Sequence, residues 1–288
     1  MSKSIEKIKG LGIAIVTPFT DKGEVDYECY KKIINYNIKR GVDYIVFLGT
    51  TGESPTLSLE EKINIISFGK KIIKKRTPIV IGIGGNNTQS VIDSFSKYNF
   101  NDIDAILSVS PCYNKPSQLG IINHYTKIAD KAPRPIILYN VPGRTASNMD
   151  ANTTIYLSKH KNIIAIKEAS GNIEQIKDII NRVNNNFVVI SGDDDLTIDI
   201  IKHGGVGVIS VAAQALPKEF KSDIIHDQSD QKFKIFFDLI FQEGNPSGIK
   251  SALEILGLCN KNVRLPLTEV SEKTHNKIEY FIKNLKKQ

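Results

Sequence analysis

Short apolar runs rich in β-branched residues recur eight times along the chain and constrain its fold more than any other feature. Each run shows little alternation between apolar and polar residues, which is typical of parallel strands covered on both faces. Their starts lie roughly 20 to 35 residues apart, which leaves room for one crossover helix after each run. The runs are Gly12–Val16, Tyr44–Phe47, Pro78–Gly82, Ala105–Val109, Pro135–Tyr139, Ile163–Ile166, Phe187–Ile190 and Val206–Val211. Eight such units predict the α/β class and, within it, a (β/α)8 or TIM barrel.

The remainder of the chain is predicted to be helical. Residues with side chains suited to capping a helix N-terminus are Ser58, Ser117, Asp150 and Asp195. No convincing strand follows Pro217, and helices are predicted over residues 220–241, 248–258 and 271–285. One closing barrel helix needs far fewer residues than this segment has. We therefore expect a barrel over residues 1–216 and a C-terminal helical extension, residues 217–288, packed on it.

The composition is that of a globular protein outside the membrane. Of the 288 residues, 41% are hydrophobic and 24% are charged, which excludes a disordered chain. No apolar run approaches the roughly 18 residues that a membrane-spanning helix needs, and residues 1–7 lack the apolar core of a signal peptide. Cys29, Cys112 and Cys259 are few, odd in number and far apart. They fit reduced thiols better than disulfides or a metal site, so a cytoplasmic protein is expected.

A formal net charge of +7 and a pI near 9.1 leave nucleic-acid binding as a competing, non-catalytic reading. The densest basic segment is Lys70–Arg76, where an apolar pair stands between basic pairs at helical spacing. This pattern favours a solvated helix face. No row of aromatic residues for stacking bases accompanies it. Salt-dependent retention on DNA would be the signature of this alternative.

Polar residues collect directly after several of the predicted strands, where (β/α)8 enzymes carry their active sites. Gly49–Ser54 combines glycines and two threonines, which suits an anion, although an ordinary turn with capping hydroxyls has the same composition. Ser110–Pro116 is a proline-bounded loop that presents Tyr113. Tyr139–Thr145 contains a tyrosine and Arg144, and the seventh strand ends in Ser191–Asp194.

Lys167 follows the buried run Ile163–Ile166 and precedes an acid, two small residues and a glycine. An ammonium group beside an apolar strand loses hydration, which favours the neutral amine. A neutral lysine amine can attack a ketone and form a Schiff base. Alternatively, a lysine at a strand end extends into solvent and pairs with an acid. The tyrosines and the arginine at neighbouring strand ends favour the catalytic interpretation.

Three of these segments resemble the signatures of a known family. Gly49–Glu53, Tyr139–Thr145 and Ile166–Glu168 are similar to the motifs of the dihydrodipicolinate synthases. Those enzymes belong to the pyruvate-dependent class I aldolases, together with N-acetylneuraminate lyase. The resemblance runs in order from about Gly10 to the end of the chain, and three motifs on three strands are specific in combination.

The resemblance implies condensation of pyruvate with L-aspartate 4-semialdehyde to 4-hydroxy-tetrahydrodipicolinate, on the diaminopimelate route to lysine. It implies that Lys167 forms the Schiff base and that Thr50, Tyr139 and Tyr113 form a proton relay, with Tyr113 supplied by a neighbouring subunit. Substrate-binding residues carried over in the same way are Thr51, Arg144, Gly192 and Ile209. Arg144 would bind the semialdehyde carboxylate. No metal or organic cofactor is implied, and a homotetramer built as a dimer of dimers is expected.

A sister aldolase that cleaves a sugar acid, such as N-acetylneuraminate or a 2-keto-3-deoxy acid, is the nearest alternative. Such enzymes share the lysine and the strand-five tyrosine. Arg144 and the Thr50–Thr51 pair favour the synthase, because a sugar acid offers hydroxyls where the semialdehyde offers a carboxylate.

The resemblance also bears on inhibition by L-lysine, which sensitive relatives bind at the tight dimer interface. Ser54 and Asn86 match that pocket. Positions that depart from it are Leu59, Lys62, Ser90 and Cys112. Ser90 matters most, because it replaces a glutamate that would compensate the charge of the effector. Weak or absent inhibition is predicted, and strong inhibition at low L-lysine concentrations in an activity assay would contradict it.

Overall fold

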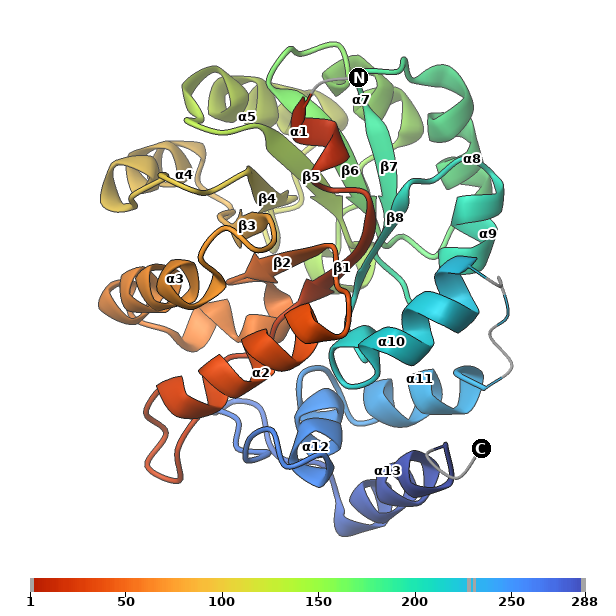
Figure 1. Cartoon of the computed structure of the whole chain (residues 1–288). Helices are drawn as coiled ribbons and strands as arrows, with labels where there is room; N and C mark the ends of the chain where they lie inside the picture. The colour runs from red at the N-terminus through yellow and green to blue at the C-terminus, as the bar shows by residue number, and fades with distance from the viewer. Residues whose placement is uncertain (1–2, 227–228, 230–231, 286–288) are drawn as a thin grey trace. The chain divides into compact units, whose positions relative to one another are not determined.

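The computed structural model describes residues 3–226, 229 and 232–285. Eight strands pair in chain order and close into a barrel, with helices between them (Figure 1), so the predicted (β/α)8 class is confirmed. The strands are β1 (Gly10–Ala14), β2 (Tyr44–Phe47), β3 (Ile79–Gly82), β4 (Ala105–Val109), β5 (Ile136–Asn140), β6 (Ile163–Glu168), β7 (Val188–Ser191) and β8 (Gly207–Ser210). Nearly all of their residues are buried, so the strands form the core.

The first strand differs from the prediction, because it begins and ends two residues earlier. Gly10 N–H donates to the carbonyl of Val206 (2.9 Å) and starts the pairing. At the other end, the Gln214 side chain accepts from Val16 N–H and donates to the Ala14 carbonyl, both at 3.0 Å. The Gln214 side chain therefore forms the backbone hydrogen bonds at the point where the sequence predicted that the strand would continue.

Three of the four residues predicted to precede a helix do so, namely Ser58, Ser117 and Asp150. The helices are α1 (Lys3–Glu6), α2 (Tyr27–Lys39), α3 (Leu59–Ile73), α4 (Thr88–Ser94), α5 (Gln118–Lys131), α6 (Pro142–Thr145), α7 (Ala151–Leu157), α8 (Ile173–Arg182), α9 (Thr197–Lys202), α10 (Pro217–Phe220), α11 (Lys234–Phe241), α12 (Ser247–Ile255) and α13 (Glu272–Leu285). Ser58 and Glu61 form a reciprocal capping box at the start of α3. The cap predicted at Asp195 is wrong, because Leu196 precedes α9. The helix predicted over 220–241 is divided, with a π-helical turn at Lys221–His226 before α11, and part of it lies outside the described residues.

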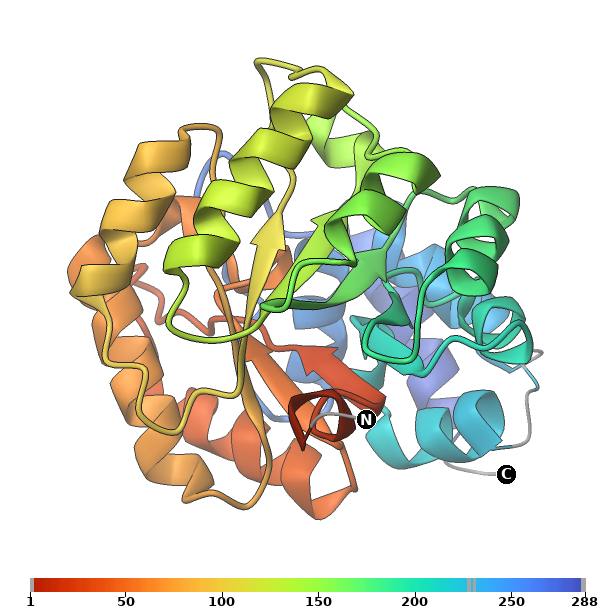
Figure 2. The ribbon, with the colours of Figure 1, turned by 90° about the horizontal axis from the view of Figure 1, so that it is seen from above.

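The chain forms two compact units. The first comprises Met1–Gly12, Asp43–Val46 and Pro78–Ser210 and holds most of the barrel strands. Within it, α4, α5, α7 and α8 lie outside the strands (Figure 2). Strands β5 and β6 pair so that Tyr139 is opposite Lys167. The register therefore brings the ends of these two strands, and their polar residues, to the same level.

The second unit comprises Ile13–Val42, Phe47–Thr77 and Val211–Gln288. Helices α11, α12 and α13 pack against one another there (blue in Figure 1). An aromatic cluster joins α10, α11 and α13 and consists of Phe220, Phe233, Phe236, Phe237 and Phe281. The division of the chain at residues 216 and 217 stays a prediction. Among the described residues, no helix has both the length and the apolar character required to cross a bilayer.

Candidate active site

Lys167 lies near the end of β6 and is almost fully buried, with 5% of its surface exposed. Its Nζ is 4.4 Å from the centroid of the Tyr139 ring, which is 7% exposed. Within the described part of the chain, no carboxylate lies within 4.0 Å of this nitrogen. A buried amine with a phenol beside it and no ion-pair partner is suited to act as a nucleophile.

The turn after β7 approaches the Lys167 side chain closely. A Cβ atom at Gly192 would lie 3.0 Å from Cε of Lys167 and 2.7 Å from Cβ of Ala169. Only glycine therefore leaves the amine its space. Burial raises the pKa of the neighbouring Asp193 carboxyl, and the Lys167 charge opposes that shift. Ile209, in the middle of β8, is fully buried.

Two of the predicted site residues are exposed in the single chain. Arg144 lies in the short helix α6 and faces solvent. Tyr113 is 88% exposed and has a φ of 71°, a left-handed conformation that is uncommon for a tyrosine. Hydrogen bonds from Asn86 to the Cys112 carbonyl (3.3 Å) and from Asn114 to the Asn86 carbonyl (3.2 Å) hold its loop. The chain thus presents Tyr113 outward on a fixed loop.

A buried hydrogen-bond network behind Lys167 was not predicted from the sequence. Glu168 is fully buried, and its carboxylate accepts from Asn140 Nδ2 (3.0 and 3.2 Å) and from Ser170 N–H (2.9 Å). Gln175 of α8 donates to the same carboxylate at 3.3 Å. Because neighbouring strand residues point to opposite faces, these bonds hold β5 and β6 from the side away from Lys167. They fix the strand that carries the amine.

Glu168 should make stability depend on pH. Burial raises the pKa of its carboxyl from 4.5 to about 7. Between these values the folded state binds a proton that the unfolded state lacks, so this group lowers the free energy of unfolding as the pH rises from 4.5 to 7. Melting temperatures at pH 5 and pH 8 should therefore differ less in Glu168→Gln than in the unchanged protein. An identical pH dependence in both proteins would contradict the assignment.

The turn that follows β2 is held by the C-terminal part of the chain, within the second unit. Thr50–Gly52 forms a 3₁₀ turn in which Thr51 is 2% exposed. Asn245 Nδ2 donates to Thr51 Oγ1 at 3.0 Å. Since this hydroxyl accepts from Asn245, its own hydrogen is left to be donated, and a carboxylate is a strong acceptor for it.

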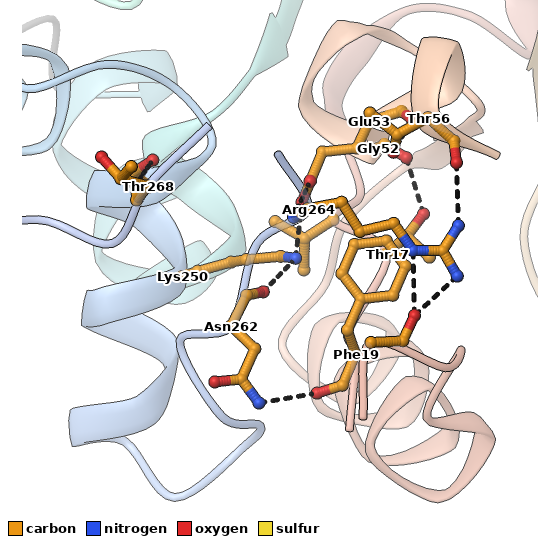
Figure 3. A network of polar contacts seen from close by, with 12 residues as sticks. Thr17, Phe19, Gly52, Glu53, Thr56, Lys250, Asn262, Arg264 and Thr268 are labelled. Carbon is orange, nitrogen blue, oxygen red and sulfur yellow. Dashed lines mark hydrogen bonds and ion pairs between the residues drawn. The ribbon is translucent and has the colours of Figure 1, made fainter. Parts of the chain in front are cut away.

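Next to this turn, Glu53 forms a fully buried ion pair with Lys250 (2.6 Å; Figure 3). Neither Asn245 nor Lys250 was predicted from the sequence, and no local pattern marks them. Among residues 3–226, 229 and 232–285, no cluster of three potential metal ligands exists. The expectation that no metal or cofactor is needed stays a prediction.

Comparisons with known proteins point to one family. The model of the dihydrodipicolinate synthetase family matches residues 7–285. Proteins named 4-hydroxy-tetrahydrodipicolinate synthase are 46% identical, one from Azobacteroides pseudotrichonymphae over 94% of this chain and 95% of that protein. Another is from Parabacteroides distasonis, over 96% of this chain and 97% of that protein. The crystal structure of dihydrodipicolinate synthase from Aquifex aeolicus has a TM-score of 0.92 and 37% identity, and covers 97% of this chain and 98% of that chain.

Proposed function

The chain belongs to the dihydrodipicolinate synthetase family, and we propose that Lys167 carries out the family reaction through a Schiff base. That reaction condenses pyruvate with L-aspartate 4-semialdehyde to 4-hydroxy-tetrahydrodipicolinate, a lyase step in lysine biosynthesis by the diaminopimelate route. The names of the relatives favour it over cleavage of a sugar acid. The observation that carries the proposal is the buried, unpaired amine beside Tyr139 at the barrel strand ends.

In the proposed mechanism, Lys167 Nζ attacks the keto carbon of pyruvate, and the carbonyl oxygen leaves as water. The iminium withdraws electrons, so that the methyl group loses a proton and becomes an enamine carbon. This carbon attacks the aldehyde carbon of the second substrate and forms the new C–C bond. Attack by the substrate amine on the iminium carbon closes the ring and frees Lys167.

Hydroxyl groups are proposed to move the protons. Tyr139, Thr50 and Tyr113 would form the relay, because a hydroxyl can accept one proton while it donates another. Support comes from the contact between Tyr139 and Lys167. The hydrogen of Thr51, left available by the Asn245 bond, would be donated to the pyruvate carboxylate. Gly192 would leave room beside the amine, and the Ile209 carbonyl would line the pocket.

The choice of nucleophile can be tested against a second buried lysine. Lys250 donates to Glu53 and to the Asn262 carbonyl, both at 2.6 Å. Because its ammonium group forms these two structural hydrogen bonds, we do not expect it to act as the nucleophile. Borohydride added with pyruvate should reduce the iminium and leave a stable adduct on the peptide that contains Lys167. An adduct on Lys250 or any other lysine would overturn the assignment, and no adduct with salt-dependent DNA retention would favour nucleic-acid binding.

Arg144→Ala is predicted to impair use of the semialdehyde far more than formation of the pyruvate adduct. The exposed guanidinium would form two charge-assisted hydrogen bonds with the second carboxylate, and their loss costs roughly 2–4 kcal/mol at the transition state. Steady-state kinetics for each substrate, with borohydride trapping for the first half-reaction, measure the difference. Equal losses in both half-reactions would show that Arg144 supports the structure of α6.

A homotetramer is proposed as the working assembly, with Tyr113 completing the site of a neighbouring subunit. Its 88% exposure on a held loop supports this role. Mixing Tyr113→Phe and Tyr139→Phe chains should restore part of the activity, because one site of the hybrid has both tyrosines. No restoration after verified subunit exchange would contradict a shared site. The free thiols support a cytoplasmic location, which cell fractionation would test.

A further inference from the structure

The turn that carries Thr50 and Thr51 is flanked by two residues in an uncommon backbone conformation. Leu48 (φ 57°) and Glu53 (φ 52°), on either side of it, are both left-handed. This conformation costs non-glycine residues of order 1–3 kcal/mol each and persists only when the surroundings enforce it. Contacts from elsewhere in the chain must therefore help to hold these two residues in place.

Two residues of the turn, Thr51 and Gly52, and the adjacent Glu53 are each held by a distant partner. Figure 3 shows the contacts of Gly52 and Glu53. Thr51 Oγ1 accepts from Asn245, and the Gly52 carbonyl accepts from Thr17 Oγ1 at 2.8 Å. Both carboxylate oxygens of Glu53 are used: Oε1 accepts from Lys250 Nζ (2.6 Å) and Oε2 from Arg264 N–H (2.9 Å). Asn245 and Lys250 stand just before and within α12, so one helix start holds two of the three residues.

The Glu53–Lys250 pair is an unusual way to stabilise a fold. Both side chains are completely excluded from solvent, and Lys250 Nζ also donates to the Asn262 carbonyl and lies 4.2 Å from the Phe19 ring centroid. Desolvation offsets most of the attraction in such pairs, and apolar replacements of both partners are often neutral or stabilising. The pair does, however, define one position for each atom. The pair therefore serves mainly to fix the position of Glu53 and adds little to the free energy of unfolding.

We propose that Lys250 and Asn245 are positioning residues for the substrate carboxylate. Lys250 fixes the turn through its ion pair with Glu53. Asn245 donates a hydrogen bond to Thr51 Oγ1, so that the hydrogen of this hydroxyl points towards the bound carboxylate. A second observation agrees: Asn245 is 8% exposed, and its Oδ1 has no hydrogen-bond partner among the described residues. Thr51 is thus the hydrogen-bond partner that the structure gives this buried side chain. This inference rests on the proposed role of Thr51 in holding pyruvate.

The test compares pyruvate with methyl pyruvate, which has the same ketone but no carboxylate charge. Borohydride trapping on Lys167 over a range of concentrations gives the half-saturating concentration of each compound. In the double variant Glu53→Gln/Lys250→Met, the ratio of the methyl pyruvate value to the pyruvate value should fall about tenfold, through weaker pyruvate binding. The glutamine keeps the bond from Arg264 N–H, and removing both charges together leaves no isolated buried ion.

Asn245→Ala provides an independent test that leaves the ion pair intact, and it should lower the same ratio. Lys283→Met, which breaks an exposed Lys283–Glu279 pair in α13 (2.7 Å), is the matched control and should not change it. A structural defect alone would weaken both compounds equally. The positioning role alone is overturned if the unchanged protein is trapped normally and the ratio stays the same in Asn245→Ala and in a folded double variant. No trapping on Lys167 in the unchanged protein overturns the proposed function as well.

Discussion

Lys167→Ala should lower kcat/KM by roughly 10⁴-fold or more, the scale seen when a covalent nucleophile is removed. No other described lysine combines burial with the absence of a carboxylate partner, since Lys250 is paired with Glu53. Without the amine, pyruvate has no electron sink to stabilise the carbanion at its methyl carbon. A coupled assay of product formation measures the loss, and the pyruvate adduct should disappear with it.

Lys167→Arg separates nucleophilicity from charge in the same experiment. A guanidinium keeps the positive charge but does not form the Schiff base, so the loss should match that of the alanine variant. Lys177→Ala, at a half-buried position on α8 paired with Glu174, is the control and should retain activity. Substantial activity in the arginine variant would mean that the charge at this position, and not the covalent step, drives the reaction.

Gly207→Ala should have the largest effect on folding. Gly207 starts β8 with a φ of 150°, and an added Cβ would lie 2.0 Å from the Gly10 carbonyl oxygen and 2.6 Å from its nitrogen. These are backbone atoms at the point where β8 meets β1, so no side chain can move aside. We expect a cost of about 4 kcal/mol or more and a melting temperature lower by about 10 °C or more.

Gly143→Ala is the matched control for this measurement, because nothing lies within 4 Å of the Cβ position there. Its melting temperature should stay close to that of the unchanged protein. Equal melting temperatures for the Gly207 and Gly143 variants would show that the junction of β8 and β1 can open without cost.

Residues with a strong local signal could be predicted from the sequence. Lys167 and Tyr139 each end an uninterrupted apolar run, and such runs fix both the strand and the position of the polar residue that ends it. The eight strands were predictable for the same reason. The end of β1 could not be predicted, because the backbone groups that follow it form hydrogen bonds with the side chain of Gln214, about 200 residues away, and not with a neighbouring strand.

The hydrogen bonds and the ion pair that hold the site residues could not be predicted from the sequence either. Asn245 and Thr51 are 194 residues apart, and Lys250 and Glu53 are 197 apart. Nothing near either residue indicates its partner. Asn140 and Glu168 are closer, and each follows a predicted site residue. Alternation along the strands places them on the opposite face, but only the pairing register shows that they meet.

The (β/α)8 barrel is commonly regarded as a modular scaffold, because variation of the loops at one end of a common barrel gives many different chemistries. The partners of Glu53 and Thr51 set a limit to that modularity here. Asn245, Lys250 and Arg264 all come after the eighth strand. A hybrid enzyme that joined these strands to the C-terminal segment of another family member would take the turn of Thr50 and Thr51 from one parent and the residues that hold this turn from the other. Recombination after β8 would therefore succeed only between parents that share these three residues.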